Sequence, residues 1–359
     1  MEKLDKQTRA QYRRKVKEEF PEKINMGDSI FIKKISMRYG ENPGYPAAFY
    51  QEKGASGPNM STLKVLKQGT KGLGYINVAD MDLGQRLIKK LSSIYENKKI
   101  CVLIKHEMPS GVALGDSPEQ VFIKAWKCDP LSNFGSVDVF NYTITEELAK
   151  IIIEKGRVVE VVYAPDFTDK ALEVLSNRKP LRVVKMGSSL SQPSLDNDME
   201  FKRVAGGLLV QKRFDSRITS HDKTEVVSKR KANPDEIEAA IFNWNVACFT
   251  RSNAVVIGQR DKVHGIGSGQ RSRIDSAEDA IKFSKRGYGP DKCVLASDAF
   301  MPFPDVVELA AKSGITAIIF PLGSIKDKVV IERADELGLS MIATKSPGQT
   351  DSERCFLHR

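Results

Sequence analysis

The chain has 359 residues, of which 41% are hydrophobic and 28% are charged, and its formal net charge at pH 7 is +10. This is the composition of a soluble globular protein, and no apolar run reaches the roughly 18 residues that a transmembrane helix requires. We therefore expect no membrane span, and the length favours two domains over one. The basic excess is dispersed along the chain, so we expect small polyanionic ligands in preference to nucleic acid.

The N-terminus and the cysteines indicate a cytoplasmic protein. Residues 1–20 are charged throughout and lack the apolar core of a signal peptide. They predict a surface helix whose apolar side is formed by Leu4, Tyr12, Val16 and Phe20. The cysteines are odd in number and scattered, and none forms a Cys-x-x-Cys pair, which indicates reduced thiols and no zinc site. They are Cys101, Cys128, Cys248, Cys293 and Cys355.

The middle and the end of the chain alternate between strand and helix patterns. Apolar runs predict strands over 100–105, 158–165, 181–186, 254–259, 292–297, 315–321 and 339–344. Apolar spacings of three and four predict helices over 117–126, 145–156, 169–177, 275–287, 303–314 and 326–338. Apolar strands that alternate with helices predict a three-layer α/β/α fold with strands buried on both faces.

The order of elements occurs twice. In each half a Gly-rich turn leads into a helix with a capping-box start, at Ser117–Gln120 and at Ser276–Asp279. We interpret this as an internal duplication into two similar domains, residues 1–222 and 223–359, joined in the polar stretch 213–235. Chance correspondence of generic βα units is the alternative.

Lys105 and His106 follow an apolar strand. In open α/β sheets ligands bind outside the carboxyl ends of the strands. An imidazole there suits a general base, and a neighbouring ammonium stabilises developing negative charge. We expect the Pro-Ser-Gly sequence at 109–111 to form the bend that leaves both side chains at the sheet edge. The alternative is a surface pair on a loop.

A second polar cluster surrounds the turn GIGSGQ at 265–270. This turn resembles a phosphate-binding loop only loosely, because it is GxGxG and not GxGxxG. Asn253 precedes it at the start of a strand, and its amide both donates and accepts hydrogen bonds. Arg271 and Arg273 follow it and suit a carboxylate or a phosphate, or else they are solvated arginines beside a tight turn.

The loop at 297–305 carries aromatic residues around Pro302. Phe300, Met301 and Phe303 are either caps of the core or walls for a flat ring, and Asp305 suits the edge of a heterocycle. Taken alone, Arg38 and Tyr39 indicate only a turn. Arg354 and His358 alone indicate only a frayed C-terminal tail.

Nine stretches occur in the following order: RYGENP, KHEMPSGVALG, SNFGSVDVFN, FKRVAGGLLVQ, SNAVVIGQ, GIGSGQRSR, SDAFMPFPD, GSIKDKVVIERADELG and RCFLHR. In this order the chain, from about residue 30 to its end, resembles the AICAR formyltransferase family. This family is the transformylase part of the bifunctional purine biosynthesis protein, and AICAR is 5-aminoimidazole-4-carboxamide ribonucleotide.

The resemblance implies transfer of a formyl group from 10-formyltetrahydrofolate to the 5-amino group of AICAR. It also implies two cytidine-deaminase-like domains and a homodimer with active sites at the interface. The His-x-Glu and Cys-x-x-Cys signature of zinc deaminases is missing from the sequence, so zinc is not expected. A potassium ion is expected from the family.

The resemblance also implies a role for individual residues. The catalytic residues are Lys105, His106, Asn253 and His358. The residues that bind AICAR are Arg38, Tyr39, Phe134, Gly135, Glu160, Arg273, Phe300, Phe303 and Arg354. The residues that bind folate are Met301, Pro302 and Asp305, and those beside potassium are Thr250, Ser252 and Asp298.

These roles fit the chemistry. The AICAR amine is a weak nucleophile, so His106 would remove its proton during attack on the formyl carbon. Asn253 and Lys105 would hold the formyl oxygen as it becomes anionic, and Lys105 or His358 would assist departure of the folate nitrogen.

The sequence departs from the family pattern in two ways. It lacks the N-terminal IMP cyclohydrolase domain, so we expect no cyclohydrolase activity and a separate IMP cyclohydrolase downstream. Gly44 and Tyr45 replace the usual His-Gln after RYGENP, which leaves open a related formyltransferase with a modified pterin donor. A non-catalytic module that binds purine nucleotides is a separate alternative, against which the presence of Lys105, His106, Asn253 and His358 argues.

Overall fold

The computed structural model describes residues 14–192, 199–213, 216 and 218–344. The chain divides into two compact units. Unit 1 comprises Met1–Gln85 and Ser136–Arg213, and unit 2 comprises Arg86–Gly135 and Phe214–Arg359. This grouping differs from the single boundary expected at 222/223. Residues 86–135 belong with the C-terminal part because their hairpin pairs with a later strand, Ala113 opposite Lys262.

Unit 1 contains a small parallel sheet. Its strands β7 (Ser136–Phe140), β8 (Val159–Ala164) and β9 (Arg182–Lys185) are parallel, and β4 (Lys64–Lys67) adds antiparallel to β9. The helices α4 (Glu146–Ile152) and α5 (Asp169–Ser176) connect the parallel strands and pack against each other. Each begins at a threonine, Thr145 or Thr168, whose hydroxyl accepts a backbone N–H of the first turn.

Unit 1 also contains two smaller antiparallel sheets. The first joins β1 (Lys23–Met26), β2 (Ser29–Ser36) and β3 (Ala48–Glu52). The second is the hairpin of β10 (Met199–Val204) and β11 (Gly207–Lys212). The helix α2 (Tyr75–Ile94) begins in unit 1 and ends in unit 2.

Unit 2 contains a larger mixed sheet in the order β12-β17-β16-β15-β13-β14-β6-β5. The strands are β5 (Lys99–Lys105), β6 (Met108–Gly115), β12 (Glu225–Val226), β13 (Val255–Gln259), β14 (Lys262–Gly267), β15 (Val294–Ser297), β16 (Ala317–Phe320) and β17 (Ser340–Ala343). The helices are α3 (Pro118–Cys128), α6 (Pro234–Ala247), α7 (Arg273–Ser284), α8 (Asp305–Lys312) and α9 (Asp327–Glu336). Strands β15, β16 and β17 are parallel, as βα units require.

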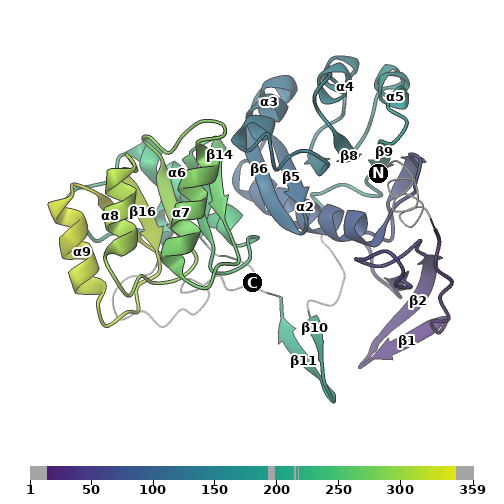
Figure 1. Ribbon diagram of the computed structural model, residues 1–359, viewed down its shortest axis with the longest axis horizontal. Coiled ribbons are helices and arrows are strands. Elements are labelled where there is room, and N and C mark those ends of the chain that lie inside the picture. The colour runs from purple at the N-terminus through teal and green to yellow at the C-terminus, as the bar shows by residue number, and fades with distance from the viewer. Residues whose placement is uncertain (1–13, 193–198, 214–215, 217, 345–359) are drawn as a thin grey trace, which may run out of the picture. The chain divides into compact units, whose positions relative to one another are not determined.

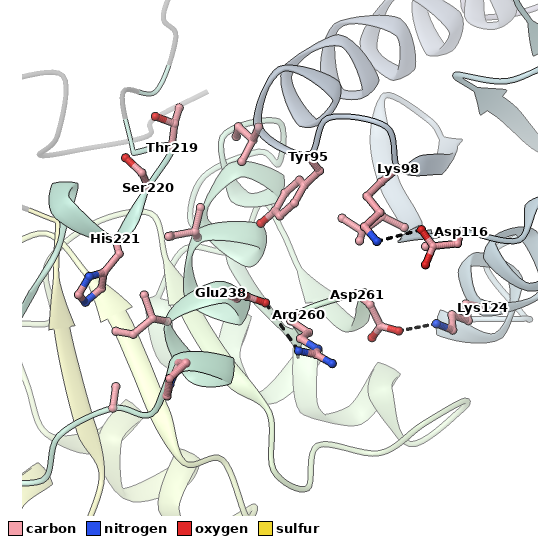
Figure 2. A pocket seen from close by; sticks show the side chains of 17 residues that line it. Tyr95, Lys98, Asp116, Lys124, Thr219, Ser220, His221, Glu238, Arg260 and Asp261 are labelled. Carbon is pink, nitrogen blue, oxygen red and sulfur yellow. Dashed lines mark hydrogen bonds and ion pairs between the residues drawn. The ribbon is translucent and has the colours of Figure 1, made fainter.

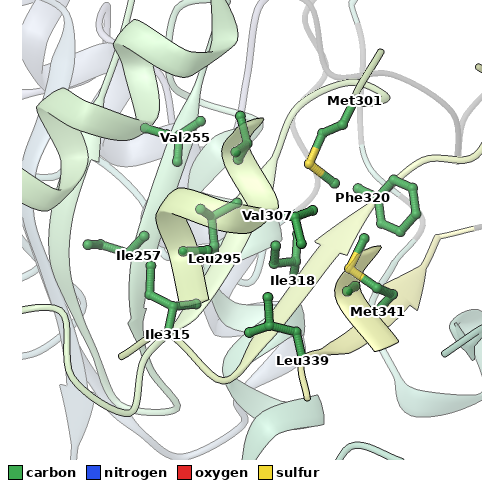
Figure 3. Packing of buried hydrophobic residues seen from close by; sticks show 14 of the residues in the cluster. Val255, Ile257, Leu295, Met301, Val307, Ile315, Ile318, Phe320, Leu339 and Met341 are labelled. Atoms are coloured by element: carbon green, nitrogen blue, oxygen red, sulfur yellow. The ribbon is translucent and has the colours of Figure 1, made fainter. Parts of the chain in front are cut away.

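The helices of unit 2 lie on both faces of its sheet. Figure 1 shows α7, α8 and α9 next to one another, and they pack on a core that includes Val255, Ile257 and Leu295 (Figure 3). The opposite face meets α6, because a side chain at Gly258 would lie 2.8 Å from Asn243 Oδ1 of that helix. Unit 2 is therefore a three-layer α/β/α arrangement, and the expected α/β class is confirmed. The duplication stays a prediction.

The expected strands and helices are present, but some of their ends differ. Ser117 caps α3 as expected, through the backbone N–H of Gln120 at 3.3 Å. The capping box expected at Ser276 is wrong, because α7 begins earlier and its cap is Ser272. The surface helix expected over 1–20 is wrong for residues 14–20, which are not helical, and residues 1–13 lie outside the described part.

Two helices were missed in the sequence. The helix α6 begins inside the stretch interpreted as a linker, although its start carries a full signal. Asn233 caps the helix, Pro234 is its first residue, and Glu236 completes the capping box. The helix α2 begins after Gly74, whose backbone N–H donates to Asn77 Oδ1 of the first turn at 3.1 Å. In the described part of the chain, none of the helices is long and apolar enough to cross a membrane.

Asp138 is a buried carboxyl group in the centre of β7. Its Oδ1 accepts a hydrogen bond from the Ser136 hydroxyl, and its Oδ2 has no partner among the described residues. Burial raises the pKa of Asp138 to about 7. The unfolded chain releases this proton near pH 3.9, so the free energy of unfolding falls as the pH rises from about 4 to about 7.

An Asp138→Asn variant should lack this dependence. We expect it to unfold at a higher urea concentration than the wild type at pH 8, with a gross gain of about 4 kcal/mol that vanishes near pH 4. Urea titrations at pH 4, 5.5 and 8 measure the effect. An equal slope of stability against pH in both proteins would show that Asp138 is ionised in the folded state.

Candidate functional site

Lys105 and His106 lie at a tight turn between β5 and β6. The bend is formed by His106 and Glu107, whose φ angles are 52° and 57°. The expected bend at Pro-Ser-Gly is wrong, because residues 109–111 continue β6. Two consecutive left-handed residues are the geometry of a two-residue hairpin turn. The turn exposes His106 and leaves Lys105 half-buried at the end of its strand.

Lys105 is held by the main chain of the segment that precedes β7. Its Nζ donates hydrogen bonds to the carbonyl oxygens of Phe134, at 3.1 Å, and of Gly135, at 2.8 Å. An ammonium has three N–H donors, so one is left for a ligand as far as the described residues are concerned. The predicted residues Lys105, Phe134 and Gly135 are thus brought together.

A cavity of about 570 Å³ lies next to this turn, entirely within unit 2. This volume is typical of a small-molecule site. Lys105, His106 and Phe134 line it on one side, and Ser268 and Gln270 of the Gly-rich turn line it as well. The structure therefore places the Lys-His pair and the Gly-rich motif around one cavity, whereas Asn253, Arg271 and Arg273 are not among the residues that line it.

Asn253 connects the Gly-rich turn to α7. Its Nδ2 donates to the carbonyl oxygens of Gln270, at 2.9 Å, and Arg271, at 3.2 Å. Its Oδ1 accepts from a terminal nitrogen of Arg273 at 2.9 Å. Both N–H donors of this amide, and one of the two acceptor positions of its oxygen, are occupied by protein.

Arg273 forms a buried ion pair. Its second terminal nitrogen bonds the Ser297 hydroxyl at 3.0 Å and the carboxylate of Asp298, whose side chain is fully buried. Only 11% of the Arg273 side chain is exposed. Arg273, Asn253 and Asp298 are brought together as a structural network, so Arg273 is not free to bind a phosphate without breaking it.

The turn expected over 265–270 is wrong for residues 265–267, which belong to β14, and the glycines there have a packing role. A Cβ at Gly267 would lie 1.8 Å from the carbonyl oxygen of Ser276, and one at Gly265 would lie 2.0 Å from that of Ala280. Both acceptors belong to α7, so β14 packs directly against that helix. The glycines of the motif therefore allow the strand to pack closely on the helix. In the sequence, a glycine pattern required for packing looks the same as one required for phosphate binding.

The residues expected beside potassium offer oxygen atoms. Thr250 is fully buried, and its hydroxyl donates to the carbonyl of Val246 at 3.1 Å. Asp298 has a buried Oδ2 without a partner in the part of the chain that is described. Oxygen is the ligand type that hard cations take, so the donor types fit, although Arg273 already neutralises Asp298. No cluster of three or more His, Cys, Asp or Glu side chains suited to a metal occurs among the described residues.

The sequence left open whether the apolar residues of the loop before α8 cap the core or face a flat ring. Met301 is fully buried in the core under α8, as Figure 3 shows, whereas Phe303 is 54% exposed. The Lys326 ammonium lies 4.8 Å from the centroid of the Phe303 ring. Asp305 begins α8, and its carboxylate accepts the backbone N–H of Val306 at 2.8 Å. Phe300 is half-buried and Pro302 is exposed.

Unit 1 carries the other predicted residues. The Arg38 guanidinium lies 5.2 Å from the centroid of the Tyr39 ring and donates to the carbonyl of Lys71. Glu160 accepts from Asn77 at 3.1 Å and pairs with Arg182 at 3.6 Å. Sequence reasoning missed Asn77 and Arg182.

Arg182 could have been identified from the sequence, because it is a charged residue within an apolar strand. It is only 6% exposed, and its Nε donates to the carbonyl of Gly72 at 2.6 Å. Burial lowers the pKa of Arg182, Glu160 opposes that change, and Arg38 adds to it. Arg182 pairs with Glu160, and its main-chain partner Gly72 is next in the chain to Lys71, the partner of Arg38, so the three side chains lie around one segment. His358 and Arg354 lie outside the described residues.

A second cavity, of about 1020 Å³, lies at the opposite end of the β5–β6 hairpin (Figure 2). None of the predicted site residues lines it. Its charged groups are largely paired with one another, as Lys98 with Asp116 at 2.9 Å and Lys124 with Asp261. We therefore place the candidate site at the Lys105–His106 cavity.

A protein-family model matches most of the chain. The model described as "AICARFT/IMPCHase bienzyme" matches residues 3–283. The matched range contains Lys105, His106, Asn253 and Arg273, and it ends before the loop that carries Phe303 and the other residues of 297–305.

Proposed function

Because the chain belongs to the AICARFT/IMPCHase bienzyme family of purine biosynthesis, we propose that it is an AICAR formyltransferase. It transfers the formyl group of 10-formyltetrahydrofolate to the 5-amino group of AICAR, and the products are the formylated nucleotide and tetrahydrofolate. The observation that supports this most is the cavity in which Lys105 and His106 stand together, with Lys105 anchored on two carbonyl oxygens.

In this proposal His106 is the general base. Its side chain is exposed at the cavity, so a weakly nucleophilic amine can approach it. Removal of the amine proton during attack raises the nucleophilicity of that nitrogen. A base held on a two-residue turn has a fixed backbone, which favours one geometry of proton transfer.

Lys105 stabilises the anionic formyl oxygen. Two of its N–H bonds point to main-chain carbonyls, and the third is left for the oxygen that becomes charged in the transition state. Asn253 contributes to the same oxygen only by exchanging one of its present hydrogen bonds for the substrate. Proton delivery to the leaving folate nitrogen is a role for Lys105 or His358.

The remaining assignments rest on the resemblance. They are the AICAR contacts of Arg38, Tyr39, Phe134, Gly135, Glu160, Phe300, Phe303 and Arg354, the folate contacts of Pro302 and Asp305, the potassium ion and the homodimer. Met301 is left out of the ligand-facing set because its side chain is in the core. Sedimentation of the purified chain measures its oligomeric state, and a monomer at micromolar concentration would contradict the dimer.

A direct assay tests the proposed reaction. Protein, AICAR, 10-formyltetrahydrofolate and potassium chloride are mixed, and tetrahydrofolate formation is followed. We expect turnover that depends on both substrates. The absence of turnover with pure substrates would contradict the proposal. The family description names two activities. A parallel reaction that contains only the formylated nucleotide measures ring closure separately, and we expect no ring closure.

A further inference from the structure

Two arginines flank the Gly-rich turn and have no use in the mechanism above. Arg251 precedes Asn253, and Arg271 follows Gln270. Both are exposed, and neither guanidinium makes a hydrogen bond or an ion pair with any residue in the described ranges 14–192, 199–213, 216 and 218–344. Exposed arginines are often solvated surface groups, so exposure alone does not indicate a ligand. The positions of their backbones and neighbours are more informative.

The backbones of both arginines are held by hydrogen bonds. The carbonyl of Arg251 accepts the N–H of Gly269 at 2.9 Å, and that of Arg271 accepts the Asn253 amide at 3.2 Å. Gly269 has a φ of 69°, and a Cβ built there would lie 3.6 Å from the Arg251 Cδ. The aliphatic part of Arg251 therefore lies over Gly269.

Neither arginine lines the candidate cavity itself, but each has a backbone next to a residue that does, because the Arg251 carbonyl accepts from the Ser268 hydroxyl at 3.4 Å and Arg271 follows Gln270. Ser268 and Gln270, on the two sides of Gly269, line the cavity together with Lys105 and His106. Three carboxylates of the surrounding elements are engaged elsewhere. Asp279 accepts from Gln270 at 2.6 Å, Asp298 pairs with Arg273, and Asp129 pairs with Arg286 at 2.9 Å.

We propose that Arg251 and Arg271 bind an anionic group of a substrate, a phosphate or a carboxylate, while Arg273 keeps the site in shape. A guanidinium binds either anion through two parallel hydrogen bonds. The identity of the substrates rests on the proposed function, which supplies two anions of this chemistry. One is the 5′-phosphate of AICAR, and the other is the γ-glutamate tail of the folate.

Binding measurements without turnover test the proposal and separate the two sources. The probes are AICAR against its dephosphorylated nucleoside, and 5-formyltetrahydrofolate with three glutamates against the same compound with one. We expect the wild type to prefer the more anionic member of at least one pair by about tenfold or more. The preference should shrink as sodium chloride rises from 0.05 to 0.5 M, which are the chosen experimental conditions, because screening weakens exposed pairs.

An Arg251→Gln/Arg271→Gln double variant should lose that preference. Loss in the nucleotide pair assigns the arginines to the phosphate, and loss in the folate pair assigns them to the tail. Arg260→Gln is the matched control, because Arg260 is an exposed arginine at the other end of β13 that pairs with Asp235 at 2.9 Å. An Arg251→Lys/Arg271→Lys variant keeps the charge and should retain part of the preference.

The outcomes are distinguishable from failure of the proposed function. If the double variant folds, as its melting temperature shows, and keeps the wild-type preference in both pairs, the inference is overturned. A wild type that shows no preference in either pair overturns it as well. A protein that binds with the expected preference but does not turn over would contradict only the formyltransferase activity.

Discussion

A His106→Asn variant is expected to lose about 10²–10⁴-fold in kcat for formyl transfer, which is the usual contribution of a general base. The physical reason is that no other imidazole lines the cavity among the described residues. Asparagine is chosen over alanine because His106 has a φ of 52°, a conformation that asparagine adopts more readily than most residues. The variant should therefore keep the turn and lose the base. Steady-state kinetics with AICAR varied at saturating donor measure the effect.

The matched control for this variant lies in the same turn. Glu107 has a φ of 57° and is exposed, but it does not line the cavity. A Glu107→Asn change should leave kcat within about twofold of the wild type, since surface changes of this kind have small effects. Imidazole added to the buffer should restore part of the activity of His106→Asn. Full activity of His106→Asn without imidazole would overturn the assignment of the base.

An Asp298→Ala variant is expected to lower the free energy of unfolding by about 3–5 kcal/mol. The change leaves the Arg273 guanidinium in a buried place without its carboxylate, since the side chain of Asp298 is fully buried and that of Arg273 is 11% exposed. Arg273 also holds Asn253, at 2.9 Å, so the Gly-rich turn should lose its order together with the ion pair. Urea unfolding at pH 7 measures the change in stability.

Two further variants make this result interpretable. Glu332→Ala removes a carboxylate from the exposed pair with Lys328, at 3.9 Å, and should leave the midpoint of unfolding unchanged. Replacing both Arg273 and Asp298 with leucine should recover much of the lost stability, because no unpaired charge stays buried. A midpoint for Asp298→Ala equal to that of the wild type would show that the pair does not stabilise the fold.

Much of the fold could be predicted from the sequence because its elements carry local signals. The apolar runs at 254–259 and 315–321 correspond to β13 and β16, and the Ser117 cap marks the start of α3. The α6 start was missed although Asn233 and Glu236 form a capping box there. The turn at His106 was misplaced because two consecutive non-glycine residues with positive φ are uncommon, whereas Pro-Ser-Gly is typical of turns.

By itself the sequence determined the α/β class, the position of Lys105 and His106 at a strand end, and the family. Only the tertiary structure decided which charged residues pair with other residues of the chain and which are left for ligands. Arg273 and Arg271 are two positions apart, yet one is bound by Asp298 and the other is exposed. Periodicity reports how one element meets the core, but the partner of a buried charge comes from a distant segment, here 25 residues away. The burial of Met301 also depends on tertiary packing, because it belongs to a buried cluster with Val306 and Val307 of α8, which follow it in the chain.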